Sequence, residues 1–377
     1  MTDRRANDPD SWFCDFNAGS PVHADVLACF LEVQRACPAN PASVHAPGRR
    51  ARAVLEDARA RIGRALDLDA GDVLFTSGGT EAANLAVLGL GAAGLPVLLS
   101  PAEHPAVFEP AERRGMRLWQ VDASGAAQVT APTDRVGLLA LVHAQSEVGT
   151  LQPVALASSL AHQLDLPLFV DAAQTLGRAD LRPLFTSGAV VALSPHKAGG
   201  LRAHGVLAGV DLQQHLRPLL LGGGQEFGLR PGSQDPALAA ANALAIERAV
   251  AEQPARAAAM QAVRTTFLDA LRAAAIDHQV HTPLANSVAN TVMIGFRAVE
   301  GRNLLPALDL AGVHASHGSA CASGAPTPPR ILSAMGLDET AARACVRFSF
   351  AGDESLVEVV RAARRTADVV RRLQKKM

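Results

Sequence analysis

Between residues 73 and 209 the sequence alternates short, wholly apolar runs with longer stretches of helical character. The apolar runs are VLFT (73–76), PVLLS (96–100), GLLALVH (137–143), PLFVDAA (167–173), AVVALS (189–194) and GVLAG (205–209). Runs of this length without alternating polar residues are typical of strands buried on both faces. Helical stretches such as 80–90, 106–115 and 154–165 separate most of them, which predicts the βαβ order of an open, mostly parallel sheet. Ligands of such sheets bind beyond the carboxyl ends of the strands.

The remainder of the chain predicts a second, smaller domain. Apolar residues recur at helical spacing over 49–67, and Ala-rich helical stretches follow over 235–253 and 255–275. Strand-like NTVMIGF and ACVRFSF come next, and an amphipathic helix runs from Leu356 to Leu373. At 377 residues the chain is long enough for two packed units. We expect a large α/β domain over residues 16–250, and a small α+β domain formed by residues 1–15 and 251–377.

Composition narrows the function to small-molecule chemistry. The chain is 49% hydrophobic and 19% charged with net charge −1, which argues against disorder and against a broad electrostatic field for nucleic acid. Tyrosine is absent and Phe and Trp are scarce, so base-stacking surfaces are not expected either. No run has the character of a signal peptide or the length of a membrane span, so we expect a cytoplasmic protein without a membrane partner. Five cysteines without CxxC spacing argue against a disulfide framework or a metal site.

The segment FTSGGTEAANLA (75–86) lies between a predicted strand and a predicted helix. Small residues there leave backbone N–H groups accessible, and a helix N-terminus favours negative charge, so the segment could hold a phosphate. The alternative is a tight turn with Thr80 as the helix N-cap and nothing bound.

Two neighbouring predicted strands end in FVDAAQ and LSPHK, which brings Asp171 and Lys197 to the same edge of the sheet. Pyridoxal 5'-phosphate needs this pair of groups. A lysine forms a Schiff base with the cofactor, and a carboxylate beside the pyridine nitrogen keeps that nitrogen protonated so that the ring accepts electrons. The alternatives are a helix-capping role for Asp171 and a solvated surface charge for Lys197, but a lysine directly after an apolar strand is unusual at a surface.

Nine segments in order resemble the cysteine desulfurases of the class V aminotransferase fold, in the subgroup with the longer cysteine loop. They are NPASVHAPGR, FTSGGTEAANLA, AEHPAV, HAQSEVG, VDAAQTLG, SPHK, LLGGGQEFGLRPGS, HGSACAS and VRFSF, and they span nearly the whole chain. The resemblance implies a fold type I PLP-dependent transferase with the two domains described above. It also implies a homodimer that converts L-cysteine to L-alanine and passes the sulfur, as an enzyme persulfide, to an acceptor protein.

The resemblance also implies roles for individual residues. His104 would stack on the cofactor ring and assist proton transfer, Gln174 would hydrogen-bond the phenolic oxygen, and Arg347 would pair with the substrate carboxylate. The phosphate would be held by Gly79, Thr80, Ser194 and His196, with Ser233 reaching in from the partner subunit.

Cys321 would be the sulfur acceptor. Its surroundings, HASHGSACASGAPTPP, are small, polar and end in proline, which is typical of a mobile exposed loop, here expected at about 314–330. A thiol that is loaded at a buried cofactor and unloaded at another protein has to travel, and such a loop allows it. We expect the other cysteines to be chemically unreactive; they are Cys14, Cys29, Cys37 and Cys345. His317 lies four residues before Cys321 and is a weak candidate for lowering the pKa of its thiol.

Three segments depart from the family pattern. Gln145 stands where the family usually has Asn, at a position expected near the phenolic oxygen and the substrate. Gly19 and Ser20 replace common threonines, and GGLRAHG replaces a Pro-Lys-Gly stretch after the lysine. Two alternatives therefore stay open. One is a selenocysteine lyase or C–S lyase on the same scaffold, and the other is a weakly active scaffold protein in a sulfur-transfer assembly.

Overall fold

The computed structural model describes residues 11–318 and 328–375, and its largest element is a seven-stranded sheet. Six strands run parallel, and β8 alone pairs antiparallel with its neighbours β2 and β7. In spatial order the strands are β2 (Val73–Thr76), β8 (Gly205–Ala208), β7 (Val190–Leu193), β6 (Leu168–Asp171), β5 (Leu138–Val142), β3 (Val97–Leu99) and β4 (Met116–Leu118). The predicted mostly parallel α/β sheet is confirmed.

Helices cover both faces of this sheet, which explains why its strands carry no polar alternation. One face packs on α2 (Ala46–Leu66), α5 (Val154–Leu164) and α8 (Pro236–Ala251) through strand residues such as Leu139 and Val170. The other face packs on α3 (Gly79–Gly89) and α4 (Pro105–Arg114) through Leu138 and Phe169. Successive strand residues point to opposite faces, so each of them is buried against one layer or the other.

The C-terminal part of the chain forms a second hydrophobic core. It contains an antiparallel sheet in the order β12 (Cys345–Ser349), β10 (Thr291–Phe296) and β9 (His278–Val280), while β1 (Trp12–Phe13) pairs in parallel with β11 (Val313–His314). The helices are α9 (Gln253–Ala273), α10 (Gly301–Asp309), α11 (Arg330–Ala334), α12 (Glu339–Arg343) and α13 (Leu356–Gln374). Cys14 packs in this core beside residues from α9, β10, β12 and α13. We therefore propose a domain boundary near residue 250, with the N-terminal strand belonging to the smaller unit.

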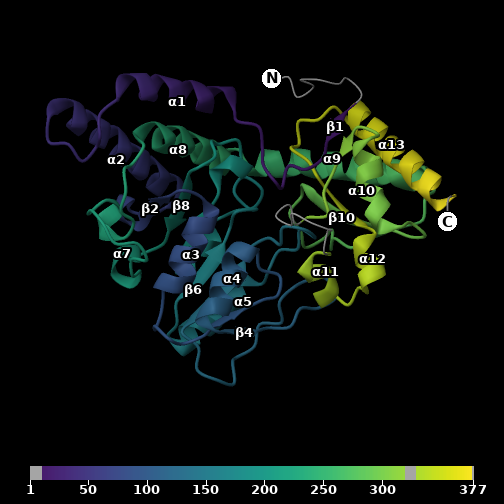
Figure 1. The fold of residues 1–377 in the computed structure, drawn as a ribbon, viewed down its shortest axis with the longest axis horizontal. Helices are drawn as coiled ribbons and strands as arrows, with labels where there is room; N and C mark the ends of the chain where they lie inside the picture. The colour runs from purple at the N-terminus through teal and green to yellow at the C-terminus, as the bar shows by residue number, and fades with distance from the viewer. Residues whose placement is uncertain (1–10, 319–327, 376–377) are drawn as a thin grey trace.

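Several short elements were not singled out by the sequence patterns. The longest is α1 (Ala24–Ala36), which packs on α8 through Val26, while α6 (Arg182–Thr186) and α7 (Leu212–His215) are single turns. The 3-10 turns are η1 (Ala70–Asp72), η2 (Pro195–Lys197) and η3 (Glu226–Gly228). Figure 1 shows α1 to α8 with the large sheet on one side of the molecule and α10 to α13 with β10 on the other. No helix in the described ranges combines the length and apolar character that crossing a membrane requires.

A buried ion pair fastens the segment after α7 to the large sheet. Arg59 of α2 donates from Nη1 and Nη2 to the two carboxylate oxygens of Glu226, at 2.8 and 2.9 Å, and the two side chains are only 2% and 1% exposed. The Phe75 N–H of β2 also donates to Glu226, and Arg59 donates to the Val73 carbonyl. Glu226 and Phe227 both have positive φ, 47° and 58°, so this turn holds a backbone conformation that L-residues rarely adopt.

Removing the Glu226 carboxylate should therefore destabilise the fold strongly. Glu226→Ala leaves the buried Arg59 guanidinium with the half-exposed Glu56 carboxylate as its remaining ion-pair partner among the described residues. Breaking a buried ion pair costs about 3–5 kcal/mol in proteins. The free energy of unfolding is measured by urea denaturation followed by far-UV circular dichroism. The control is Asp134→Ala, which removes an ion pair with Arg117 whose side chains are 51% and 57% exposed. It should cost less than about 1 kcal/mol, and equal losses in the two variants would contradict a structural role for the buried pair.

Candidate active site

A cavity of about 250 Å³ opens at the carboxyl ends of β5, β6 and β7. This is where a parallel sheet binds its ligands. The wall includes most of the residues predicted from sequence, namely Gly79, Thr80, His104, Asp171, Gln174, Ser194, His196, Lys197 and Arg347.

Asp171 and Lys197 reach this cavity from adjacent strands. Asp171 is the last residue of β6 and is 7% exposed, and Lys197 ends the turn that follows β7. Burial lowers the pKa of the Lys197 amine to about 8, because a charged ammonium loses its hydration there, while the negative charge of Asp171 opposes part of that shift. The amine is therefore far easier to deprotonate than an ordinary surface lysine.

The N-terminus of α3 forms one end of the cavity. Its N-cap is Gly78, so the alternative with Thr80 as N-cap is wrong, and Thr80 instead lies in the first turn, where backbone N–H groups have no partner within the helix. A Cβ on Gly79 would lie only 2.3 Å from the Ser194 hydroxyl oxygen. A larger residue at position 79 would therefore displace the Ser194 hydroxyl from its place beside the helix start. Burial lowers the pKa of His196 to about 4, which leaves a neutral imidazole able to donate one N–H.

His104 is held rigidly as the N-cap of α4. Its Nδ1 accepts the Ala106 N–H at 3.1 Å, which leaves Nε2 as the protonated nitrogen of the neutral ring. Burial lowers the pKa of His104, and the nearby Asp171 carboxylate acts against that shift. The preceding residue, Glu103, was missed by the sequence reading. It accepts the Val142 N–H, and burial raises its pKa to about 8.

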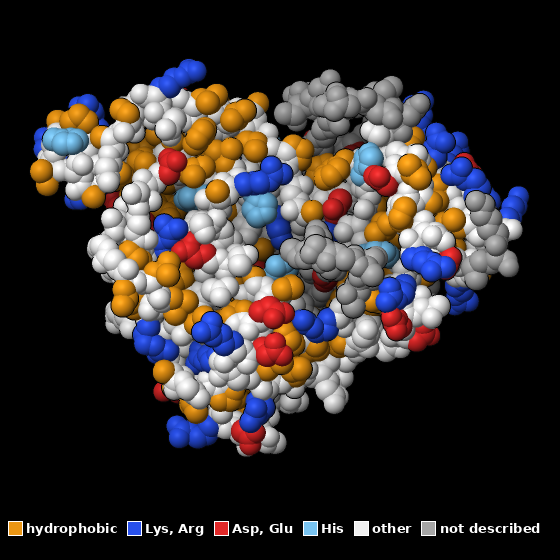
Figure 2. All heavy atoms as spheres, in the orientation of Figure 1, with side chains coloured by type: hydrophobic (Ala, Val, Ile, Leu, Met, Phe, Trp, Pro, Cys, Tyr) orange, Lys and Arg blue, Asp and Glu red, His pale blue; other side chains and the backbone are white. Residues whose placement is uncertain are grey.

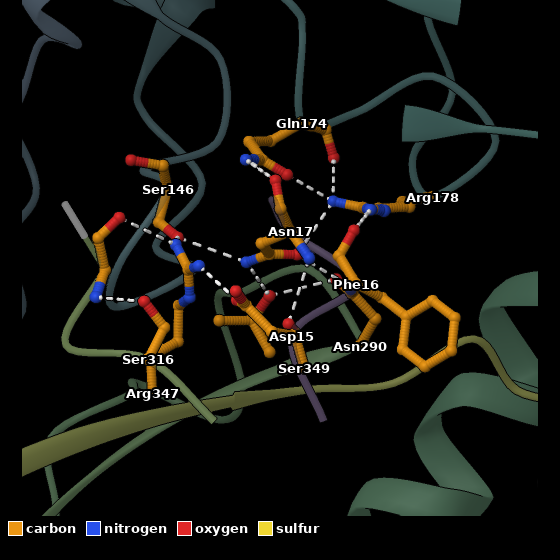
Figure 3. A network of polar contacts seen from close by, with 12 residues as sticks. Asp15, Phe16, Asn17, Ser146, Gln174, Arg178, Asn290, Ser316, Arg347 and Ser349 are labelled. Atoms are coloured by element: carbon orange, nitrogen blue, oxygen red, sulfur yellow. Dashed lines mark hydrogen bonds and ion pairs between the residues drawn. The ribbon is translucent and has the colours of Figure 1, made fainter. Parts of the chain in front are cut away.

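Arg347 of β12 brings a nearly fully buried guanidinium into the same cavity, 2% exposed (Figure 3). Its Nη1 donates to the carbonyls of Ser146 and Gly318, at 2.9 and 3.2 Å, and its Nη2 pairs with Asp15 at 2.5 Å. Nε is buried and has no hydrogen-bond partner among residues 11–318 and 328–375. A buried N–H without an acceptor is costly, so this nitrogen is a ready donor for an anionic group of a ligand.

Gln145 does not take the place expected for it. Its side-chain oxygen accepts the N–H groups of Glu147 and Val148, both at 2.7 Å, and its amide nitrogen donates to the Glu147 carboxylate. The side chain therefore stabilises its own turn, and the neighbouring Ser146 and Glu147 line the cavity instead. The HAQSEVG turn thus reaches the cavity through Ser146 and Glu147, and a role for Gln145 at the cofactor stays a prediction.

Two other predicted site residues are absent from the cavity wall, one because of where it lies and one because it is not described. Ser233 is exposed and lies outside the cavity wall. Cys321 lies outside the described residues.

His317 does not fit the role of a cationic neighbour for a thiolate. Its Nδ1 lies 2.7 Å from the Cys345 carbonyl oxygen, and burial lowers its pKa, so the ring is neutral at physiological pH. A neutral ring supplies no positive charge to stabilise a thiolate. The thiols of Cys14 and Cys345 are buried, which raises their pKa, that of Cys345 to about 12, as the inert reading of these two cysteines expects.

Comparison with known proteins agrees with this geometry. The family model described as "Aminotransferase class-V" matches residues 12–361. This chain belongs to the class-V aminotransferase family. Over 376 residues it is 30% identical to the putative cysteine desulfurase IscS 1 of Bacillus subtilis, covering 96% of this chain and 99% of the relative. It is 31% identical over 367 residues to the IscS-like cysteine desulfurase of Mycobacterium tuberculosis, covering 89% and 90%.

Solved structures give the same family relationship. A NifS-like protein superimposes with a TM-score of 0.85 at 26% identity, covering 96% of this chain and all of the other. A structure of SspA in complex with cysteine superimposes with a TM-score of 0.76 at 26% identity, covering 91% and 99%.

Family membership implies pyridoxal 5'-phosphate as the cofactor, and the cavity residues fit such a group. The close approach of Gly79 to Ser194 at the start of α3 forms a cradle suited to a phosphate. A buried lysine with a lowered pKa stands across the cavity near a buried carboxylate, as the cofactor's aldehyde and pyridine nitrogen require.

The lowered pKa of Lys197 can be measured directly, because the chain contains only three lysines, at positions 197, 375 and 376. In cofactor-free protein, acylation of Lys197 should reach half its maximal rate near pH 8, since only the neutral amine reacts. Asp171→Asn removes a negative charge that favours the ammonium form, so its curve should move to lower pH. The rates are obtained by pulse labelling and peptide mass spectrometry.

Asp180→Asn, at an exposed ion pair with Arg182, is the matched control and should leave the curve in place. A half-maximum near pH 10.4, about the value of a solvated lysine, would contradict the burial argument.

Proposed function

We propose that this protein is a cysteine desulfurase that converts L-cysteine to L-alanine and carries the sulfur as a persulfide on Cys321. The observation that carries the proposal is the shared cavity of three groups, namely the Lys197 amine, the Asp171 carboxylate and the unpartnered Nε of Arg347. An amino-acid substrate needs a group that binds its carboxylate beside the cofactor, and Arg347 is suited to that task. Relatives named cysteine desulfurase, 30–31% identical over nearly their full lengths, support the same substrate.

The cofactor would be held at four points of the cavity. Asp171 would pair with the pyridine nitrogen, Gln174 would donate to the phenolic oxygen, and His104 would lie against the ring. The phosphate would bind at the start of α3 and the β7 turn, to Gly79, Thr80, Ser194 and His196. When bound, pyridoxal phosphate supplies an electron sink that makes bonds at the α- and β-carbons of an amino acid labile.

Residues of the chain then transfer the protons and accept the sulfur. With a pKa of about 8, Lys197 Nζ has a substantial neutral fraction near physiological pH, so it can remove the proton from the substrate α-carbon and return it. His104 holds a proton at Nε2. The Cys321 thiolate attacks the substrate sulfur, so that an S–S bond forms and the Cβ–S bond breaks. The electron pair of the broken bond takes up a proton, which leaves alanine, and the persulfide sulfur passes on to an acceptor protein.

The proposal includes a homodimer. Figure 2 shows hydrophobic side chains gathered over the region where Figure 1 places α1. Leu27 and Leu31 on α1 are 45% and 43% exposed, and Leu220, Leu221 and Phe227 are also exposed. Apolar surface of this kind marks a protein contact. Ser233 follows Phe227 in the same exposed segment, which supports its reaching the phosphate of a second copy.

The decisive test of this function is Cys321→Ser. The variant should keep the visible absorption band of lysine-bound cofactor but lose the persulfide, and its alanine formation from cysteine should fall by about 100-fold or more, as expected when a nucleophile is removed. Alanine is quantified by amino-acid analysis and the persulfide by alkylation and mass spectrometry. Cys37→Ser, at the end of α1, is the control. Unchanged alanine formation in Cys321→Ser would favour a C–S lyase, and absence of both colour and alanine in the unaltered protein would favour the scaffold alternative.

Arg347→Lys should show whether this guanidinium binds the substrate carboxylate. Lysine keeps the charge but loses the planar fork, and hydrogen bonds to charged groups contribute about 1.5–3 kcal/mol, so KM for cysteine should rise about 10- to 100-fold. The value of kcat should change much less. Steady-state kinetics give both constants, with Arg343→Lys, at an outward-facing pair with Glu339, as the control. A lower kcat at unchanged KM would contradict this role.

A further inference from the structure

Arg178 is a buried cation next to the cavity whose hydrogen-bond partners are all neutral (Figure 3). Its Nη1 donates to the side-chain oxygen of Asn17 at 2.9 Å and to both the backbone and side-chain oxygens of Gln174. Its Nη2 donates to the carbonyls of Phe16 and Lys197, at 3.1 and 3.3 Å. Among residues 11–318 and 328–375 no carboxylate forms an ion pair with it. One guanidinium thus joins the N-terminal segment, the turn after β6 and the lysine turn after β7.

This contact determines which end of the Gln174 amide faces the cavity. A guanidinium has five N–H donors and no acceptor, so the Gln174 group that meets it must be the oxygen. The amide nitrogen then lies on the other side, where it donates one hydrogen to the Asn17 carbonyl at 3.1 Å. Its second hydrogen is left for an acceptor, and Gln174 lines the cavity. Reversing the amide would press its NH₂ group against the guanidinium.

We propose that Arg178 is a positioning residue that holds the Gln174 amide with its N–H donors toward the cofactor's phenolic oxygen. The proposal rests on the cofactor assignment made above but not on the reaction with cysteine. The fork geometry of Arg178 is essential to it, because a single side chain has to reach Gln174, Asn17 and the Lys197 carbonyl together.

The charge of Arg178 has a second, separable effect. Burial lowers its pKa to about 9, so it is still cationic at neutral pH. It contributes, after burial itself, to the lowered pKa of Lys197. Arg178→Lys retains this charge and loses the fork, whereas Arg178→Met loses both. Comparing the two variants therefore separates the effect of the fork on the orientation of the Gln174 amide from the effect of the charge on the pKa of Lys197.

The test uses the cofactor-loaded protein and follows the visible band of lysine-bound cofactor as a function of pH. A donor to the phenolic oxygen stabilises its deprotonated form, so losing that donor raises the midpoint of the titration. Arg178→Lys should raise it by about one pH unit, the size expected for one hydrogen bond to a charged group. Gln174→Ala should raise it similarly. In the double variant the two shifts should not add, because both remove the same contact.

Arg256→Lys is the matched control. Arg256 is also largely buried near the N-terminal segment, but it lies outside the wall of the cavity that Gln174 lines. Its variant should leave the midpoint unchanged. Additive shifts in the double variant, or no shift in a folded Arg178→Lys protein, would overturn the proposal.

Gln174→Glu keeps the proposal testable if Arg178→Lys fails to fold. A carboxylate accepts the Arg178 fork even better than an amide oxygen but offers no donor to the cavity. Both Gln174→Glu and Gln174→Ala lose the donor to the Asn17 carbonyl, but only the carboxylate keeps an acceptor for Arg178. Gln174→Glu should therefore have a higher urea midpoint than Gln174→Ala and still show the raised spectral midpoint. A Gln174→Glu protein that is less stable than Gln174→Ala, or an unchanged band, would be evidence against the contact. The pH titration of the visible band does not depend on turnover of cysteine. A protein that binds the cofactor but forms no alanine would therefore refute the desulfurase function and leave the role proposed for Arg178 standing.

Discussion

The site depends on the burial of the Lys197 amine beside the Asp171 carboxylate at the carboxyl edge of the sheet. Burial makes the amine easy to deprotonate, and the carboxylate keeps the shift moderate, so the group can exchange a proton near physiological pH. This balance exists because β6 and β7 are adjacent and parallel, which ends both strands at one edge. The cradle at α3 and the cap at His104 are placed by the same sheet through the helices that follow β2 and β3.

The N-terminal segment links the two guanidiniums on the other side of the cavity. Asp15 pairs with Arg347, which β12 of the C-terminal core supplies, while Phe16 and Asn17 accept from Arg178, which follows β6 of the large sheet. Asn290 also donates to the Asn17 side chain at 2.8 Å (Figure 3). Asp15, Phe16 and Asn17 therefore hold Arg347, the proposed substrate-binding arginine, and Arg178, the proposed positioning arginine, in one network. This explains why the segment matters although it contributes few side chains to the cavity itself.

The departures from the family pattern affect the site less than their sequence positions imply. Gln145 stands where the family usually has Asn, but its side chain forms hydrogen bonds within its own turn rather than lining the cavity. This weakens the argument for an inactive scaffold. In the altered stretch after the lysine, Ala203 has a positive φ of 59°, a backbone conformation that residues other than glycine rarely adopt.

The sequence alone determined the elements and the chemistry carried by consecutive residues. Wholly apolar runs predicted the strands because a parallel sheet is covered on both faces. The polar residues that follow those runs, Asp171 and Lys197, identified the edge of the sheet at which the cavity opens. The tertiary structure decided what depends on residues far apart in the chain. It brought Arg178 against the side-chain oxygen of Gln174, paired Asp15 with Arg347, and engaged Gln145 in hydrogen bonds within its own turn. Local periodicity reports which face of an element is buried, but the partner of a buried polar group comes from another segment, and its hydrogen-bond geometry exists only once both segments have packed.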